Sequence, residues 1–494
     1  MKKNIILILS VLTGLVLSSC SDWLDVRPKT EVPRDDMFSK ESGYEDTLNG
    51  CYIKMNGNGL YGKFLTLSGI DFLARYYNMA SSGTLEYGLT EFDYENEYVK
   101  SQIGGTYSDF YNVILQANDI ITHIDSDAGR KAVKSETKRN LIKGEALAMR
   151  AYLHFDILRL FGQVPQNATI TVQLPYSSII GTASRPLYDF AGYTALLLED
   201  LNEAERLMAE DPCIKNNLNT HVHEGEDDDF FHYRKFRFNY YAVKALQARV
   251  HLYLGNRQEA YRAAKSIIEA ENSDGSRYFQ LAGDNDFMLS HFAMPSETIM
   301  GLSNSSLEDN SNVRLFKNDA TTFPMLFSKD RRDQLFDHDT GSNNRYSRWW
   351  GEVSNVTGTP NPYYKKYIQD EGGTGDSEKL NYKWLVPLLR LSEIYLIAME
   401  ATDDLAEANS LYTEYMLARN VQIVNKFSSL DEVKAQTVFE MRIEFMAEGQ
   451  MFYTYKRTGA TNMFFDHKEI TEENYIVPIP DSELKMSTEN EGNN

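Results

Sequence analysis

Apolar residues recur at helical spacing over long stretches of the chain, and the first of these stretches begins near Tyr107. Phe110, Ile114 and Ala117 fall on one face of a helix there. The same period resumes in the next stretch and stops at Gly162, a residue type that commonly ends helices. Further stretches with this spacing predict helices over 188–208, 239–254, 257–270, 389–401, 405–420 and 430–448.

The predicted helices follow one another in pairs, such as 188–208 with 239–254. Each helix has an apolar stripe that it cannot bury alone, so neighbouring pairs must stack to form a core. Paired helices of this size predict an all-α, tetratricopeptide-like scaffold of about four helix pairs, with repeats of about 34 residues. We expect this scaffold over about 103–161, 188–270 and 388–448.

Two stretches interrupt the helical pattern, at about 56–102 and 271–387. Both are rich in Gly, Asn and aromatic residues, and the second is far longer than an ordinary connection between helices. Linkers are not rich in Trp and Tyr. These stretches therefore predict an irregular, loop-rich cap that folds against the scaffold and presents the ligand site.

The first residues have the pattern of an export signal. Lys2 and Lys3 precede an apolar run from Ile5 to Leu17, which is shorter than the about 20 residues that a membrane-spanning helix needs. Two serines stand directly before Cys20 and resemble a lipobox, in which the cysteine is acylated. Acyl chains on Cys20 would hold a folded domain on a membrane without a spanning helix.

These signals divide the chain into a signal peptide (1–19), a lipidated tether (20–34) and a single domain (35–494). The alternative is a plain secretory signal in which Cys20 is incidental. No later stretch approaches the length of a membrane span.

The composition fits an exported, folded chain. Hydrophobic residues make up 42% of the 494 positions, and the formal net charge is −21 with a pI near 4.9. This negative charge argues against nucleic acid or an anionic membrane surface as a partner, so we expect membrane contact only through the lipid anchor. Cys51 and Cys213 could form one disulfide, but they do not make a disulfide framework.

Five groups of short motifs are spread along the whole chain. Each is weak alone, but together, behind a lipobox, they are specific. They are Cys20-Ser21-Asp22-Trp23-Leu24-Asp25-Val26-Arg27-Pro28; Gly144-Glu145-Ala146 with Arg150-Ala151-Tyr152, Phe155 and Leu160-Phe161-Gly162; Leu389-Arg390-Leu391-Ser392-Glu393-Ile394-Tyr395-Leu396-Ile397-Ala398; Arg442-Ile443-Glu444-Phe445 with Glu448-Gly449; and Val477-Pro478-Ile479-Pro480. In these motifs the chain resembles the SusD/RagB family of surface glycan-binding lipoproteins.

The resemblance implies a protein that is lipid-anchored in the outer membrane and exposed at the cell surface. Retention on the inner leaflet is the alternative, because the dense acidic run often found after the lipidated cysteine is missing. Such a protein binds oligosaccharide or polysaccharide and delivers it to a partner, a SusC-like TonB-dependent transporter. It is not an enzyme, and no cofactor is expected. One alternative is a lid of the same fold that serves peptide or glycopeptide uptake and has no glycan affinity of its own. A lipid-anchored hydrolase is a second alternative, although the sequence contains no Gly-x-Ser-x-Gly, Walker, dinucleotide or His-Glu-x-x-His motif.

The charged residues of the motifs have a structural interpretation that needs no ligand. Their spacing is typical of helix caps and of ion pairs between helices. We therefore expect them to hold the scaffold together, and we expect the ligand contacts to lie in the cap. The residues concerned are Glu145, Arg150, Arg390, Glu393, Arg442 and Glu444.

A glycan site requires flat apolar faces that stack on sugar rings, with amides, carboxylates and arginines that hydrogen-bond the hydroxyls. One segment of the second interrupted stretch has this composition. The resemblance implies a second contribution from the loops that follow an earlier, shorter predicted helix, which contains Tyr44, Leu48 and Tyr52. The alternative is that these aromatic residues anchor the core of the cap. The candidate glycan-binding residues are Asn344, Arg345, Tyr346, Trp349 and Trp350 in the first group and Asp71, Arg75, Tyr76 and Tyr77 in the second.

Two acidic segments suggest metal-site hypotheses. His221, His223 and His232 flank carboxylates that could ligate zinc or calcium, and the run from Asp284 to Asp286 could offer oxygens to calcium. The histidine spacing matches no closed structural site, and such segments are more often solvated loops. We therefore expect no metal.

Overall fold

The structure is a computed structural model. It describes residues 33–77, 82–180, 185–216, 218, 229–288, 292–307, 310, 328–337, 341–354, 360–367, 383–423, 425–465, 468–481 and 483. The expected signal peptide and Cys20 lie outside these residues. Within the described part of the chain, no helix is both long enough and apolar enough to cross a membrane.

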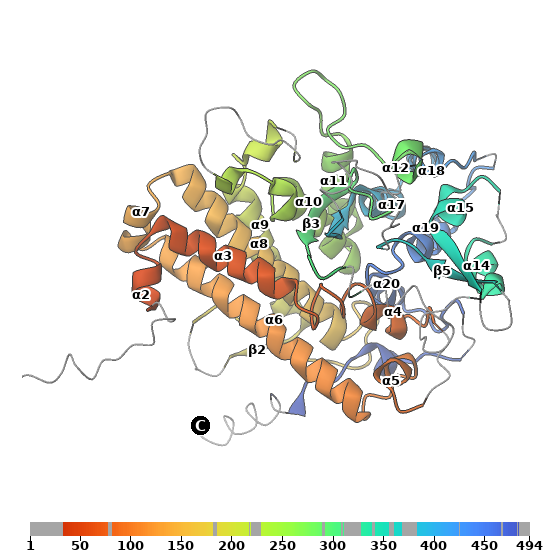
Figure 1. The fold of residues 1–494 in the computed structure, drawn as a ribbon, viewed down its shortest axis with the longest axis horizontal. Helices are drawn as coiled ribbons and strands as arrows, with labels where there is room; N and C mark the ends of the chain where they lie inside the picture. Colours follow the sequence, from red (N-terminus) through yellow and green to blue (C-terminus); the bar gives the residue numbers. More distant parts are fainter. Residues whose placement is uncertain are drawn as a thin grey trace, which may run out of the picture.

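Long helices make up the first half of the described chain. α6 packs against both α3 and α8, and α8 packs against α9, so that α3, α6 and α8 lie side by side (Figure 1). Ser135 begins α8, because its hydroxyl accepts a hydrogen bond from the backbone N–H of Lys138 at 3.2 Å. The helices are α2 (Arg34–Met37), α3 (Glu41–Met55), α4 (Gly69–Leu73), α5 (Leu85–Thr90), α6 (Glu97–Ile124), α7 (Asp127–Ala132), α8 (Glu136–Phe161) and α9 (Phe190–Leu207).

Further helix pairs extend this stack. α10 packs against α11, α11 against α17, and α17 against α18 and α19. Small residues such as Ala260 and Ala264 are fully buried where these helices approach one another. The predicted all-α scaffold of paired helices is thus confirmed. Its second half consists of α10 (Tyr240–Tyr253), α11 (Arg257–Ile268), α17 (Leu391–Ala401), α18 (Leu405–Leu417), α19 (Leu430–Glu444) and α20 (Met451–Thr458).

Short elements fill the stretches between the long helices. The described strands form three antiparallel pairs, β1 with β2, β3 with β6 and β4 with β5. These elements are β1 (Leu174–Pro175), β2 (Leu187–Tyr188), β3 (Thr298–Ser303), β4 (Trp350–Ser354), β5 (Pro360–Tyr364), β6 (Leu385–Arg390), α12 (Asp284–Met288), α14 (Lys329–Leu335), α15 (Asn344–Arg348), η1 (Pro212–Ile214), η2 (Asp229–Phe231), η3 (Arg234–Phe236) and η5 (Glu472–Tyr475).

The ladder between β3 and β6 closes the base of the second interrupted stretch. Ser303 pairs with Leu385 and Thr298 pairs with Arg390, so the chain leaves the scaffold along one strand and returns along its neighbour. α14, α15, β4 and β5 lie between these strands in sequence and occupy one side of the molecule (Figure 1). The insertion is therefore a cap with a defined attachment to the scaffold.

One expected helix boundary was wrong. α6 begins at Glu97 rather than near Tyr107, because Asn96 caps it by accepting a hydrogen bond from the Tyr98 N–H at 3.0 Å. The first turns of α6 contain Gly104 and Gly105, which weaken the periodic signal. The cap also contains short helices and the paired strands β4 and β5, so it is more regular than its composition suggested.

The charged motif residues lie in the buried interfaces between helices, as expected. Arg150 of α8 forms a two-pronged ion pair with Asp200 of α9, at 2.5 and 2.7 Å. Glu393 of α17 pairs with Arg249 of α10 at 2.5 Å. Glu145 is fully buried and pairs with Arg234 and Arg237, which follow the histidine-rich acidic segment that ends at His232. These pairs hold successive helix layers together.

Candidate functional site

A groove of about 620 Å³ opens between α18, α19 and the cap segment that leads into α15. This volume lies within the range of about 300–1,000 Å³ that is typical of small-molecule sites. Both apolar and polar side chains face it. The lining residues are Phe336, Asp337, Asn343, Arg345, Tyr412, Met416, Val421, Ile423, Phe427, Glu432, Ala435, Gln436, Phe439, Glu440 and Ile443.

Half-buried aromatic residues form one wall of the groove. Phe427 and Phe439 are partly exposed, and the Phe427 ring contacts the buried Tyr412 ring with centroids 4.8 Å apart. Gln436 is partly exposed, and Glu432 is exposed at the rim. An apolar ring face next to an amide and a carboxylate is the combination that a sugar ring and its hydroxyls require.

The position of Phe427 is fixed by its backbone. Asn409 of α18 accepts a hydrogen bond from the Phe427 N–H at 2.8 Å and donates one to the Phe427 carbonyl at 3.2 Å. Ser429 then begins α19, because its hydroxyl accepts a hydrogen bond from the Glu432 N–H at 3.2 Å. The turn between α18 and α19 therefore presents Phe427 to the groove from a rigid support.

Buried charges form the floor of the groove. Arg345 Nη1 lies 2.7 Å from Glu440 Oε2 and 3.2 Å from Glu444 Oε2, and it also donates to the Tyr415 hydroxyl at 3.0 Å. Arg345 is fully buried and Glu440 is almost fully buried. The floor is thus formed by charged groups that already have partners.

Beneath the floor lies a larger group of charges, which we call the central ion-pair cluster. Glu444 accepts from Arg390 and Arg419, each at 3.0 Å, as well as from Arg345. Burial raises the pKa of Glu444, but the guanidiniums of Arg419, Arg390 and Arg345 outweigh that effect and hold it well below its usual range. The members of the cluster are Glu297, Glu440, Glu444, Glu448, Arg345, Arg390, Arg419 and Lys366.

These eight groups comprise four carboxylates and four cations, so the cluster is formally neutral. Glu297 precedes β3, Arg390 ends β6, Arg345 belongs to α15 and Glu444 ends α19. The cluster therefore joins the cap to the scaffold directly below the groove.

Asp71 of α4 is fully buried beside this cluster. Its Oδ2 accepts a hydrogen bond from the Ala447 N–H at 2.6 Å, whereas its Oδ1 has no hydrogen-bond partner among the described residues. Burial raises the pKa of Asp71 to about 8, and the Ala447 N–H and the Lys366 ammonium only partly oppose this rise. Asp71 is therefore a neutral carboxylic acid at neutral pH.

Asp71 gives a testable pH dependence. Its pKa is higher in the folded than in the unfolded protein, so above about pH 4 the folded state binds more protons and stability falls as the pH rises. We expect the free energy of unfolding of the wild type, relative to Asp71→Asn, to fall by about 2 kcal/mol between pH 6 and 7.5. Urea unfolding of both proteins at the two pH values measures this difference. Equal slopes with pH would show that Asp71 is ionised in the folded state.

The structure buries the two tryptophans that were proposed as a sugar-stacking platform. Trp349 is 0% exposed and packs edge-on against Tyr364, and Trp350 is 7% exposed at the start of β4. The Lys366 ammonium lies 5.3 Å from the Trp349 ring centroid. Because both indoles lie inside the cap, neither presents a ring face to a ligand here, and their placement favours the alternative role as anchors of the cap.

The other candidates of that segment also have structural partners. Asn344 is buried and donates to Asp284 Oδ1 at 2.6 Å, and Arg345 belongs to the central ion-pair cluster. Tyr346 is half-buried, and its hydroxyl donates to Asp333 at 2.7 Å. Of these three residues, only Arg345 lines the groove, together with its neighbour Asn343.

The second group of candidates lies apart from the groove lining. Asp71, Arg75, Tyr76 and Tyr77 are each at most 2% exposed. Arg75 Nε donates to the Thr90 carbonyl at 2.8 Å, and the Tyr76 hydroxyl donates to the Arg442 carbonyl at 2.6 Å. These side chains attach the loops after α3 to α5 and α19. The structure does not bring them together with Trp349 and Trp350 in one open site.

Phe427, Gln436 and Phe439 were not among the predicted site residues. Phe427 lies between two predicted helices, and Gln436 and Phe439 lie within the second of them, in a part of the chain that was assigned to the scaffold and not to the cap. The sequence did contain a signal for a sugar-binding surface, because a planar amide and an aromatic ring, Gln436 and Phe439, lie one turn apart on the same side of α19.

The metal hypotheses receive no support from the described residues, in which no group of His, Cys, Asp and Glu side chains is arranged to hold an ion. His221, His223 and their neighbouring carboxylates lie outside the described residues. Cys51 and Cys213 are buried free thiols, and burial raises the pKa of Cys51 to about 12.

Similarity to known proteins was found in sequence and in structure. A family model described as SusD-like, starch-binding and associating with the outer membrane matches residues 22–194. SusD-like protein P2 of Formosa agariphila is 23% identical over 540 residues, which cover 98% of this chain and 97% of that protein. The chain is thus similar to SusD-like proteins over almost its whole length. A second match, with SusD-like protein P25 of the same organism, is 26% identical over 158 residues and covers only 30% of this chain and 28% of P25.

Solved structures share the fold of this chain. A SusD superfamily protein from Bacteroides thetaiotaomicron has a TM-score of 0.69 and 22% identity, over 90% of this chain and 98% of that one. A laminarin-binding SusD-like protein has a TM-score of 0.63 and 20% identity, over 90% of this chain and 97% of that one. The similarity therefore extends over the helical scaffold and the cap together.

Proposed function

We propose that this chain is a SusD-like cell-surface lipoprotein that binds oligosaccharide or polysaccharide and delivers it to a SusC-like TonB-dependent transporter. Cys20, behind an export signal, would carry the lipid anchor in the outer membrane. The glycan role is supported by the starch-binding description of the family and by a structural neighbour that binds laminarin. The chain acts by binding and not by catalysis.

The observation that carries the glycan proposal is the groove between α18, α19 and the cap. It is large enough for a few sugar units, and it combines half-buried rings with a partly exposed amide and an exposed carboxylate. Phe427 and Phe439 would stack on sugar rings, and Gln436 and Glu432 would hydrogen-bond hydroxyls. Since Asn409 holds the backbone at Phe427, little ordering of this wall is needed when a ligand binds.

The test is glycan binding by a variant with both rings removed, Phe427→Ala with Phe439→Ala. We expect saturable binding of the wild type to at least one glycan in a panel that includes starch and laminarin, and a loss of at least about tenfold in affinity in the variant. Isothermal titration calorimetry measures both. The two hydrogen bonds that fix Phe427 come from its backbone, so the substitution leaves this support in place.

The matched control is Phe465→Ala, which removes a half-buried ring that does not line the groove. This variant should keep the wild-type affinity. Unchanged affinity in the folded double variant would move the site away from the groove. If no glycan in the panel binds, the lid without glycan affinity becomes the better description, and co-purification of a transporter with the membrane-bound protein would test that role.

A further inference from the structure

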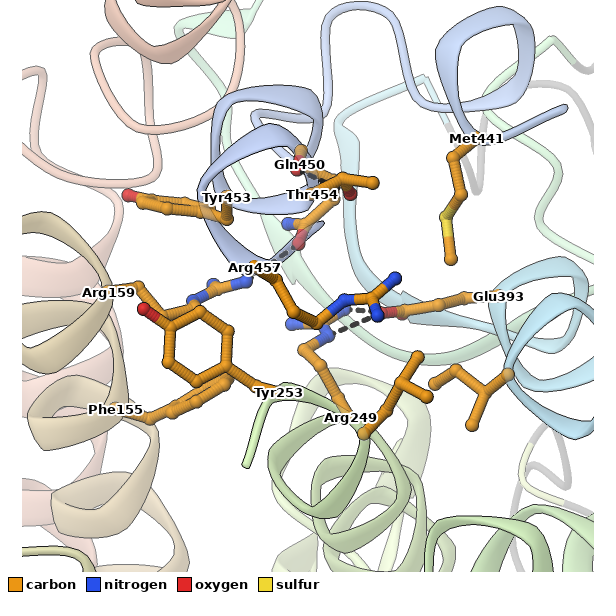
Figure 2. Close-up of a pocket in the computed structure, with 12 residues that line it drawn as sticks. Phe155, Arg159, Arg249, Tyr253, Glu393, Met441, Gln450, Tyr453, Thr454 and Arg457 are labelled. Atoms are coloured by element: carbon orange, nitrogen blue, oxygen red, sulfur yellow. Dashed lines mark hydrogen bonds and ion pairs between the residues drawn. The ribbon is translucent and has the colours of Figure 1, made fainter. Parts of the chain in front are cut away.

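A second and much smaller cleft lies where α8, α10, α17, α19 and α20 meet, and none of its lining residues lines the groove. Its volume is about 30 Å³, which leaves room for one ion or a water or two but not for a sugar. Figure 2 shows the side chains that surround it. They are Phe155, Arg159, Arg249, Leu252, Tyr253, Glu393, Ile397, Met441, Gln450, Tyr453, Thr454 and Arg457.

Guanidinium groups approach this cleft from three helices. Arg159 projects from α8, Arg249 from α10 and Arg457 from α20 (Figure 2). Each has one carboxylate partner: Arg249 pairs with Glu393 at 2.5 Å, Arg457 with Glu400 at 2.6 Å, and Arg159 with Asp156. The pairs balance in charge, but they do not use Arg249 Nη1, which has no hydrogen-bond partner among the described residues.

Some of the polar groups around the cleft have no partner among the described residues. They are Arg249 Nη1 and the hydroxyls of Tyr253 and Tyr453, although these side chains are only 6%, 3% and 4% exposed. A buried donor without a partner is costly, because it has given up its hydrogen bonds to water. The Arg249 Nη1 group needs an acceptor, because a guanidinium donates hydrogen bonds and never accepts them.

The carboxylate of Glu393 and the amide oxygen of Gln450, which line the cleft, already accept hydrogen bonds. Both carboxylate oxygens of Glu393 accept from Arg249, at 2.5 Å each, and Gln450 Oε1 accepts from Arg159 Nη1 at 3.0 Å. A cation would therefore meet guanidiniums without a free carboxylate. What remains is a set of donors beside positive charge, and this set is complementary to a small acceptor with negative charge.

We propose that this cleft binds a monovalent anion of the size of chloride, held by Arg249 Nη1 and the Tyr253 hydroxyl within the field of Arg159 and Arg457. An ion there would contact α8, α10 and α20 at once and would stabilise the junction between the two halves of the scaffold. This site goes beyond the proposed glycan-binding function and is independent of it.

Bromide is the probe, because it resembles chloride and is visible by anomalous scattering. In crystals of the purified protein grown in sodium bromide we expect an anomalous peak within hydrogen-bond distance of Arg249 Nη1 and the Tyr253 hydroxyl. In solution, replacing sodium gluconate by sodium bromide at constant ionic strength should raise the unfolding midpoint in a saturable way.

Tyr253→Phe removes the hydroxyl and keeps the ring, and it should raise the half-saturating bromide concentration by about tenfold or more. Tyr44→Phe is the matched control, because the Tyr44 hydroxyl is also buried without a partner in the described structure but belongs to α3. This control should respond to bromide like the wild type. A cleft that holds only water would overturn the proposal. A crystal peak without a saturable effect in solution would mean an adventitious ion only, and would overturn it as well.

Discussion

Glu444→Gln should destabilise the protein by about 3–5 kcal/mol, because it leaves three buried guanidiniums with one negative charge too few. Arg345, Arg390 and Arg419 all donate to Glu444, at 3.0–3.2 Å, and all are at most 1% exposed. Because glutamine has nearly the same shape as glutamate, the loss of stability measures the effect of removing the negative charge alone. Urea unfolding at pH 7 measures the change.

Glu95→Gln is the control for this variant. Glu95 is 85% exposed on the surface and pairs only with Lys100 in the described structure, so its substitution should leave the unfolding midpoint unchanged. If Glu444→Gln proved as stable as Glu95→Gln, the cluster would not hold the cap to the scaffold.

Trp349→Ala should also cost about 3–5 kcal/mol of unfolding free energy, as removal of a fully buried aromatic residue usually does. The ring packs against Phe287 and Tyr364, each with centroids 5.9 Å away, and both neighbours belong to the cap. The control is Trp384→Ala, because Trp384 is 40% exposed and its loss should change stability little. Chemical unfolding compares the two.

The same variant tests whether Trp349 contacts a ligand. A Trp349→Ala protein with the stability of the wild type but without glycan binding would restore this residue to the binding site. The expected result is the opposite, a less stable protein whose groove still binds when the protein is folded.

The sequence predicted the scaffold well because helix pairs leave a local signal. The apolar spacing before Gly162 and the small residues of α10 and α11 follow from neighbours only a few positions apart. The site could not be predicted in the same way. An exposed aromatic platform and a buried aromatic anchor have the same composition, and the partners of Trp349 include Tyr364 and Phe287, which no local pattern links to it.

Local sequence patterns could not predict the groove either. Phe427 and Phe439 fall in and beside predicted scaffold helices, and they become a wall only because the cap segment near Arg345 lies opposite them. That juxtaposition depends on charges far apart in sequence, from Glu297 to Glu448, which pair only in the folded chain. Local spacing could suggest that these residues form ion pairs, but it could not name their partners.

The ladder between β3 and β6 has a consequence for how such a chain can diversify. Ser303 and Leu385 are direct neighbours across the ladder, so everything between them begins and ends at one fixed point. The entropic cost of closing a loop between two fixed ends grows only with the logarithm of the loop length. Each doubling of the length costs about 0.6 kcal/mol more. Residues can therefore be gained, lost or exchanged within this segment while the helical stack keeps its register, and ligand preference can change without a new fold.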